Sequence, residues 1–307
     1  MKFLQTIKYC LALLLLVAGV VSAKKYYKHV DAEGVVHYSD QKPRDVDDFE
    51  SWQVRVADSE NQVKVVNRGT KRMPIFYAVN GYHGPVEVRL SFAQIQNVQS
   101  DPPWPARYLV PGNSDLYLST VTPINDQRSW SMRYRIDAVL GDPRAKHDAS
   151  YAYALPFVGN KKYFVSQAFG GEFSHHLDQS MHAVDIAMPE GSKVLAARGG
   201  VVMEIANDFY GGGVDAKHLS RANFVRILHD DGSMAVYAHL QLESVVVAKG
   251  QRVEKQQEIG RSGSTGFSSG PHLHFVIQAN KGMKLQSVPF KWKKKNGRLV
   301  TPEVGPI

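Results

Sequence analysis

Histidine is unevenly distributed along this 307-residue chain. Eight of its twelve histidines follow residue 174: His175, His176, His182, His218, His229, His239, His272 and His274. A single histidine is usually structural, whereas several histidines near a carboxylate commonly hold a metal ion. Metal coordination is therefore the first chemistry to consider for this part of the chain.

The most specific local pattern is a pair of histidines two residues apart. His272 and His274 lie in the segment Gly-Pro-His-Leu-His-Phe-Val-Ile, which predicts a strand. Alternate residues of a strand point to the same face, so the two imidazoles should project together while Leu273 and Phe275 enter the core. Such pairs also occur by chance, so the pair alone does not distinguish a zinc site from two histidines without a metal.

A carboxylate interrupts a second apolar segment. Asp185 lies in the run Ala-Val-Asp-Ile-Ala-Met. A carboxylate on a buried strand needs a cation or several hydrogen-bond donors to offset its desolvation. A structural aspartate that caps a turn is the alternative. His239, in Tyr-Ala-His-Leu, adds a histidine at the end of a third predicted strand.

Other catalytic chemistries find little support. Cys10 is the only cysteine and lies in the N-terminal apolar run, which excludes disulfides, thiolate zinc sites and a cysteine nucleophile after its removal. Ser262, Ser264 and Thr265 lie in a Gly-rich loop without the strand-turn-helix context of a serine nucleophile. Residues 211–213 are three glycines that lack the following Lys-Ser/Thr of a phosphate loop, so a flexible groove wall is the better interpretation.

The elements that would position these residues are strands. Residues 223–229 and 233–239 flank Asp-Asp-Gly, a hairpin signal, and His229 is expected at the surface beside this turn. No long amphipathic helix is evident, so residues 151–290 predict an all-β catalytic domain. Residues 51–148 alternate apolar and polar positions between Pro- and Gly-containing turns, which predicts an immunoglobulin-like β-sandwich for binding or spacing. His83 and His147 are isolated there and expected at the surface.

The N-terminus predicts export. A basic start, a short apolar run and the ending Val-Ser-Ala are typical of a cleavable signal peptide, here residues 1–23. A retained anchor is the alternative, and membrane contact is expected only in that case. Residues 24–45 predict a small β module, and a charged linker covers 41–50. The run from Tyr26 to Asp40 resembles a module common at the start of exported proteobacterial proteins, which implies location more than activity.

The formal charge is +8, and +6 once Lys2 and Lys8 leave with the signal. This balance favours anionic surfaces such as wall polymers or lipid headgroups. Nucleic acid is not an expected partner, because the charge is dispersed and no nucleic-acid motif accompanies it. The one dense cluster surrounds Trp292 and contains Asn296-Gly297, so a solvated hairpin is expected within a basic C-terminal tail, residues 291–307.

Between about Gln167 and Asn280 the motifs agree with one family in order and spacing. They are an early histidine, Ala-Val-Asp-Ile-Ala-Met-Pro-Glu-Gly, Tyr-Ala-His-Leu, Gly-Arg-Ser-Gly-Ser-Thr-Gly and Gly-Pro-His-Leu-His-Phe. This set resembles the lysostaphin/LytM-type zinc endopeptidases. The resemblance implies one zinc ion held by the early histidine, Asp185 and His274. It implies that His239 and His272 flank the zinc-activated water as catalytic residues.

The early histidine departs from the usual spacing of that family. Many members place it four residues before the aspartate, where this chain has Met181. His182 is three residues before Asp185 and would point to the opposite face of an extended strand. Members with a longer loop carry a Ser-His pair further upstream, which here selects His175 as the ligand. His176 and His182 stay open as alternatives.

The resemblance implies a function as well. The implied function is that of an exported zinc metalloendopeptidase, in the periplasm or cell envelope, that hydrolyses peptide bonds in peptidoglycan and acts as a D,D-endopeptidase on cross-links. The alternative is a non-catalytic LytM-like domain that activates a wall amidase. Members with that role typically lack several metal ligands, whereas every ligand position can be filled here.

Overall fold

The computed structural model describes residues 23–30, 36–39, 42, 48, 50–55, 62–159, 161–294 and 296–307. Apart from the short 3-10 helix η1 (Ala216–His218), every regular element of this described part is a strand. The predicted all-β fold is therefore confirmed. No helix among these residues is long and apolar enough to cross a membrane. The predicted signal peptide lies outside the described residues except for its last position.

The N-terminal strands form a small antiparallel sheet. β1 (Ala23–Val30) pairs with β2 (Val36–Ser39) on one side and with β3 (Glu50–Arg55) on the other. The first pair corresponds to the predicted strand-turn-strand module. β3 joins this sheet, although residues 51–55 fall within the range predicted for the sandwich.

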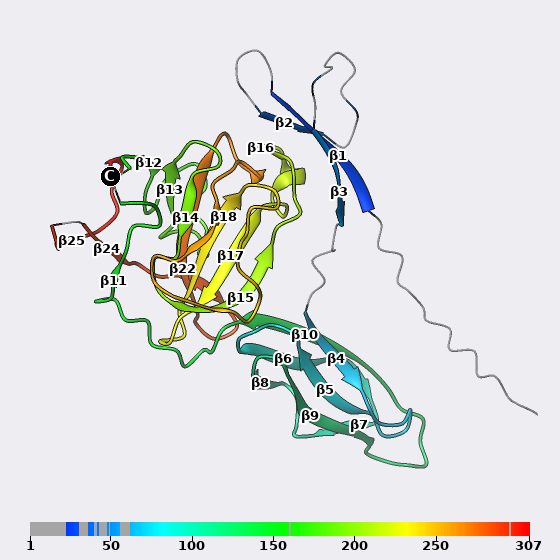
Figure 1. Cartoon of the computed structure of the whole chain (residues 1–307). Helices are drawn as coiled ribbons and strands as arrows, with labels where there is room; N and C mark the ends of the chain where they lie inside the picture. Colours follow the sequence, from blue (N-terminus) through cyan, green and yellow to red (C-terminus); the bar gives the residue numbers. More distant parts are fainter. Residues whose placement is uncertain are drawn as a thin grey trace, which may run out of the picture.

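The middle of the chain forms two antiparallel sheets that share one core (Figure 1). The four-stranded sheet contains, in order, β4 (Val63–Asn67), β5 (Ile75–Asn80), β9 (Ser114–Pro123) and β7 (Val98–Asp101). The three-stranded sheet contains β10 (Ser131–Leu140), β6 (Val86–Gln96) and β8 (Ala106–Val110). In β5, Phe76 and Ala78 are buried and meet Val88 and Leu90 of β6 in the same cluster. Alternating apolar residues thus produce the predicted sandwich.

The remaining residues build a larger antiparallel sheet. Its order is β19 (Arg252–Val253), β15 (Gly200–Ala206), β17 (Asn223–Leu228), β18 (Met234–Leu240), β22 (His272–Asn280), β13 (Val184–Ala187), β12 (Phe164–Gln167) and β26 (Gly305–Pro306), with β23 (Leu285–Ser287) on β22. Shorter sheets are β14 (Lys193–Leu195) with β20 (Glu258–Arg261), β16 (Gly212–Gly213) with β21 (Gly266–Phe267), and β11 (Ala152–Tyr153) with β24 (Lys291–Lys293) and β25 (Leu299–Val300). The predicted hairpin of β17 and β18 is confirmed.

Burial along β22 follows the predicted alternation at its N-terminal end. Leu273 and Phe275 are fully buried, while His272 and His274 keep partial exposure. Phe275 packs in the core with Phe290 and with Trp292 of β24. The segment predicted as a basic tail therefore supplies a core tryptophan, and its last strand, β26, extends the main sheet beside β12 (Figure 1).

The sandwich packs directly on the larger sheet. Met203 and Met234 of the larger sheet belong to the core cluster of the sandwich. Glu87, only 4% exposed, accepts hydrogen bonds from the Asn280 side-chain amide at 3.0 Å and the Met283 N–H at 2.6 Å. These apolar and polar contacts fix the two domains to each other.

Two of the histidines expected at the surface are buried instead. The His147 side chain is 6% exposed, and its Nε2–H donates to the Pro289 carbonyl at 3.0 Å. His229 is 3% exposed because the hairpin turn folds it inward, where its Nδ1–H donates to the Gly199 carbonyl at 2.8 Å. His83 is half-buried and lies against Gly250. These positions depend on tertiary contacts that local turn signals do not encode.

Candidate metal centre

Strand pairing brings the principal site residues together. Asp185 of β13 lies directly opposite His274 of β22, and His274 lies opposite Ala238 of β18, one residue before His239. His272 is two residues from His274 on the same face. The predicted residues of three separate motifs therefore converge on three adjacent strands.

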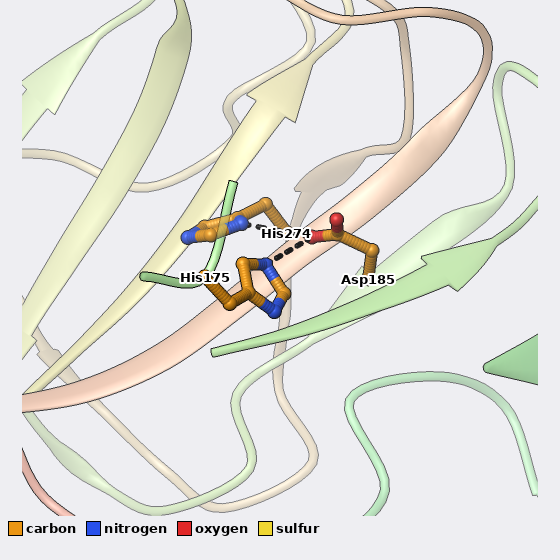
Figure 2. A group of neighbouring side chains, drawn as sticks. All are labelled: His175, Asp185 and His274. Carbon is orange, nitrogen blue, oxygen red and sulfur yellow. Dashed lines mark hydrogen bonds and ion pairs between the residues drawn. The ribbon is translucent and has the colours of Figure 1, made fainter. Parts of the chain in front are cut away.

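His175 completes the set from the loop between β12 and β13. Its Nε2 lies 3.2 Å from Asp185 Oδ1, and His274 Nδ1 lies 2.8 Å from the same oxygen (Figure 2). The ligand atoms of His175, Asp185 and His274 all lie within 4.8 Å of one another. His176 is exposed, and His182 instead contacts Ser287 through Nδ1 at 3.2 Å. Of the three candidates for the early histidine, only His175 reaches Asp185.

Backbone carbonyls fix which ring nitrogens face the site. A carbonyl can only accept, so Nδ1–H donates from His175 to Ala168 at 2.9 Å, from His239 to Thr265 at 2.7 Å, and from His272 to Gly270 at 2.8 Å. In the neutral rings Nε2 is then the atom with a free lone pair. Nε2 of His175 therefore turns an acceptor toward an Asp185 oxygen, an arrangement that calls for a cation between them.

The two further imidazoles lie beside this group. The rings of His239 and His272 are 4.6 Å apart, and the His239 ring is 5.7 Å from that of His274. His272 Nε2 lies 3.9 Å from Asp185 Oδ1. His239 adopts a left-handed backbone conformation with φ of 61°, which costs energy in a residue with a side chain. The bond from its ring to the loop carbonyl holds it in that conformation.

Burial sets the charge state of the site. Burial alone would raise the pKa of the Asp185 carboxyl, but the adjacent His175 and His274 rings hold it well below its ordinary value. Burial lowers the pKa of His239 to about 3, and the neighbouring His272 and His274 add to that effect. Burial also lowers the pKa of His272. At neutral pH the site therefore pairs an ionised carboxylate with neutral His239 and His272.

The site opens into a groove of about 490 Å³. Its wall includes Asp185, His239, His272 and His274, together with the loop of residues 267–271. Phe173 and Phe267 stack at the groove with ring centroids 5.8 Å apart and an interplanar angle of 19°.

Several groups that hold the site were not singled out from the sequence. Gln167 donates to Asp185 Oδ2 at 3.0 Å, and the Thr265 carbonyl orients His239. Thr265 also donates through Oγ1 to the Leu240 carbonyl and accepts from the Asn223 N–H. The Gly-rich loop that contains Thr265 therefore supports the His239 ring. Backbone carbonyls carry no residue-type signal, so the motifs could not reveal these contacts.

The comparisons with known proteins agree with this geometry. Residues 179–286 match the model of Peptidase family M23, and residues 13–62 match a domain of unknown function, DUF4124. The M23 match begins four residues after His175, so the structure and not this match associates that residue with the centre. The DUF4124 match contains the segment predicted as an N-terminal module.

Similar proteins come from several bacteria. An uncharacterized metalloprotease of Buchnera aphidicola is 31% identical over 41% of this chain and 31% of its own length. The peptidoglycan DD-endopeptidase ShyA of Vibrio cholerae is 34% identical over 38% of this chain and 25% of its own. Lysostaphin of Staphylococcus simulans is 33% identical over 43% of this chain and 24% of its own. The chain thus spans a third or less of these relatives, and over residues 179–286 it carries a domain of peptidase family M23, of the lysostaphin/LytM type.

Proposed function

We propose that this domain is a zinc-dependent endopeptidase that hydrolyses peptide bonds in bacterial peptidoglycan, with His175, Asp185 and His274 as the metal ligands. The convergence of these three donor atoms within 4.8 Å carries the proposal. Two imidazole nitrogens and one carboxylate oxygen are a donor set that zinc favours. Zinc held by three protein ligands would activate a water molecule for attack and polarise the scissile carbonyl.

His239 and His272 are proposed to move the protons of the reaction. Both rings are neutral, and their Nδ1–H groups are engaged by carbonyls, so Nε2 is the atom that can accept a proton. A neutral Nε2 at the groove wall can take a proton from the attacking water and return it to the leaving amine. Either imidazolium can also donate a hydrogen bond to the developing oxyanion.

The substrate and the location follow from the relatives and the N-terminus. ShyA is named a peptidoglycan DD-endopeptidase, which supports hydrolysis of a peptide cross-link by this chain. The basic, apolar and small-residue pattern of residues 1–23 supports export to the periplasm or cell envelope. The complete donor set argues against a domain that only activates an amidase.

Metal content and product analysis test the proposal together. Purified wild type should hold one zinc per chain and release products from crosslinked muropeptides, identified by mass spectrometry. Asp185→Ala and His274→Ala should lose both properties, and His175→Ala should lose bound zinc. The exposed His176→Ala is the matched control and should behave as wild type. Cleavage at the wild-type rate by His274→Ala would rule out the metallopeptidase.

A further inference from the structure

Gln167 ends β12 at a point where the strand register changes. Along β12 and β13, Val165 pairs with Ile186, but Gln167 pairs with Asp185, so two steps on β12 match one on β13. This bulge at Ser166 places the Gln167 side chain opposite the Asp185 carboxylate. Bulges of this kind often redirect a side chain beside an active site.

The Gln167 amide connects three parts of the site. Its Nε2 donates to Asp185 Oδ2 at 3.0 Å and to Ser174 Oγ at 2.7 Å, and its Oε1 accepts from the Phe173 N–H at 3.1 Å. Both of its donors and its acceptor are therefore used. Ser174 and Phe173 are the two residues that precede His175. One side chain thus joins the carboxylate to the loop that carries the third proposed ligand.

The loop is shaped to accept this side chain. A Cβ on Gly171 would lie 2.1 Å from Gln167 Cγ and 2.6 Å from its Cδ, so only glycine permits the side chain to cross there. The His175 N–H in turn donates to the Gly171 carbonyl at 2.9 Å. Gln167 and the turn that begins at Gly171 are therefore packed as one unit beneath His175.

We infer that Gln167 is a positioning residue that sets the metal affinity of this centre. Its bond to Asp185 Oδ2 occupies one carboxylate oxygen and leaves Oδ1 to face His175 Nε2 and His274 Nδ1. Asp185 would thereby offer a bound metal its Oδ1. Its bonds to Ser174 and Phe173 hold the loop that carries His175. His175 lies ten residues before Asp185 in the sequence, so strand pairing alone does not fix the position of His175 relative to Asp185.

The inference rests on the proposed metal centre and is tested by metal affinity, independently of turnover. Gln167→Met keeps the length and volume of the side chain but removes all three bonds. Partners that orient metal ligands typically change affinity 10–100-fold when they are removed, so zinc affinity by chelator competition should fall by about that factor. The visible spectrum of the cobalt-substituted variant should change, because Asp185 can then use both oxygens.

Gln278→Met is the matched control. Gln278 is buried, whereas Gln167 is half-buried; Gln278 accepts from Arg226 at 2.7 Å and donates to the Gln179 carbonyl at 2.9 Å, but it makes no bond to the proposed ligands. Its zinc affinity and cobalt spectrum should match wild type, and urea unfolding of both metal-free variants compares their stability. If Gln167→Met does not fold, Gln167→Glu serves, because it keeps an oxygen for the Phe173 N–H but cannot donate to Asp185.

The outcomes separate the two proposals. Loss of zinc by Asp185→Ala with wild-type affinity and spectrum in the Gln167 variants would overturn the positioning role alone. Wild-type zinc binding in Asp185→Ala and His274→Ala would overturn the metal centre itself. Weakened zinc binding in a folded Gln167 variant, with Gln278→Met unaffected, supports the inference.

Discussion

His229 should make the stability of this domain depend on pH between about 6.5 and 4. The residue is 3% exposed, donates from Nδ1 to the Gly199 carbonyl, and has no partner for Nε2 among the described atoms. Burial lowers its pKa from 6.5 to about 4. The nearby Arg198 lowers this pKa further, whereas Asp231 and Asp230 act in the opposite direction. Between these pH values His229 is therefore protonated in the unfolded chain but stays neutral in the folded protein.

The size of the effect follows from that shift. Each pKa unit corresponds to about 1.4 kcal/mol, so a change from 6.5 to about 4 amounts to about 3 kcal/mol. Above pH 6.5 neither state binds the proton and the full stability is present. As pH falls from 6.5 toward 4, only the unfolded state is protonated, so unfolding becomes more favourable. The residue is almost fully buried, so solvent screening reduces this value little.

Urea unfolding at several pH values between 7.5 and 4 measures this dependence of the free energy of unfolding on pH. The metal-free protein is used, so that protonation of bound ligands does not contribute. His229→Asn keeps an amide N–H that can donate to Gly199 but has no titrating ring. Its free energy of unfolding should fall by about 3 kcal/mol less than that of wild type across this range. His176→Asn, which removes an exposed histidine, should follow the wild-type curve. Parallel curves for wild type and His229→Asn would refute the reasoning.

Three further substitutions test other parts of the structure. His239→Ala should retain zinc but reduce kcat for muropeptides by about 10²–10⁴, and an unchanged kcat would remove it from the proton-transfer role. Glu87→Ala leaves the partly buried Met283 N–H without its acceptor and should lower the free energy of unfolding by about 1–3 kcal/mol in urea, whereas no loss would mean that the domains are not held through Glu87. Gly212→Ala would place a Cβ 1.7 Å from the Ser264 carbonyl oxygen, so the β16–β21 pairing should open and the loop should become sensitive to limited proteolysis. Wild-type resistance in that variant would contradict the close approach.

Local patterns predicted the parts of the site that depend on strand geometry. The alternation around His272 and His274 decides which side chains reach the core, and the Asp-Asp-Gly turn fixes the β17–β18 hairpin. A carboxylate among apolar residues indicated that Asp185 needed partners, and the structure supplies ring nitrogens on both sides of it. Each of these features depends on a few consecutive residues.

Other features depend on distant segments and left no local signal. The approach of His175 to Asp185 is set by the loop that Gln167 and Gly171 hold, not by the spacing of the histidines. Trp292 lies in a run of lysines that predicts a solvated hairpin, yet it is fully buried because β24 pairs with β11 some 140 residues earlier. A pattern limited to neighbouring residues cannot encode such contacts.

The position of the sandwich bears on whether it regulates the groove. His272 and His274 lie at one end of β22, whereas Asn280, which contacts Glu87 of the sandwich, lies at the other end. Eight residues of strand separate the two ends by roughly 26 Å. The sandwich therefore packs away from the groove, and in Figure 1 it lies beyond the end of the larger sheet.

Removal of the residues before about Ser150 should accordingly release no latent activity. It should instead expose Met203 and Met234, which the sandwich now covers, and so increase binding of a hydrophobic dye and reduce solubility. Muropeptide release per mole of truncated domain, compared with the full chain at equal zinc content, measures the first effect. A marked gain in activity on truncation would show that a segment before Ser150 blocks the groove. The position of the sandwich, fixed by the contact of Glu87 with Asn280, would then not explain how substrate reaches the groove.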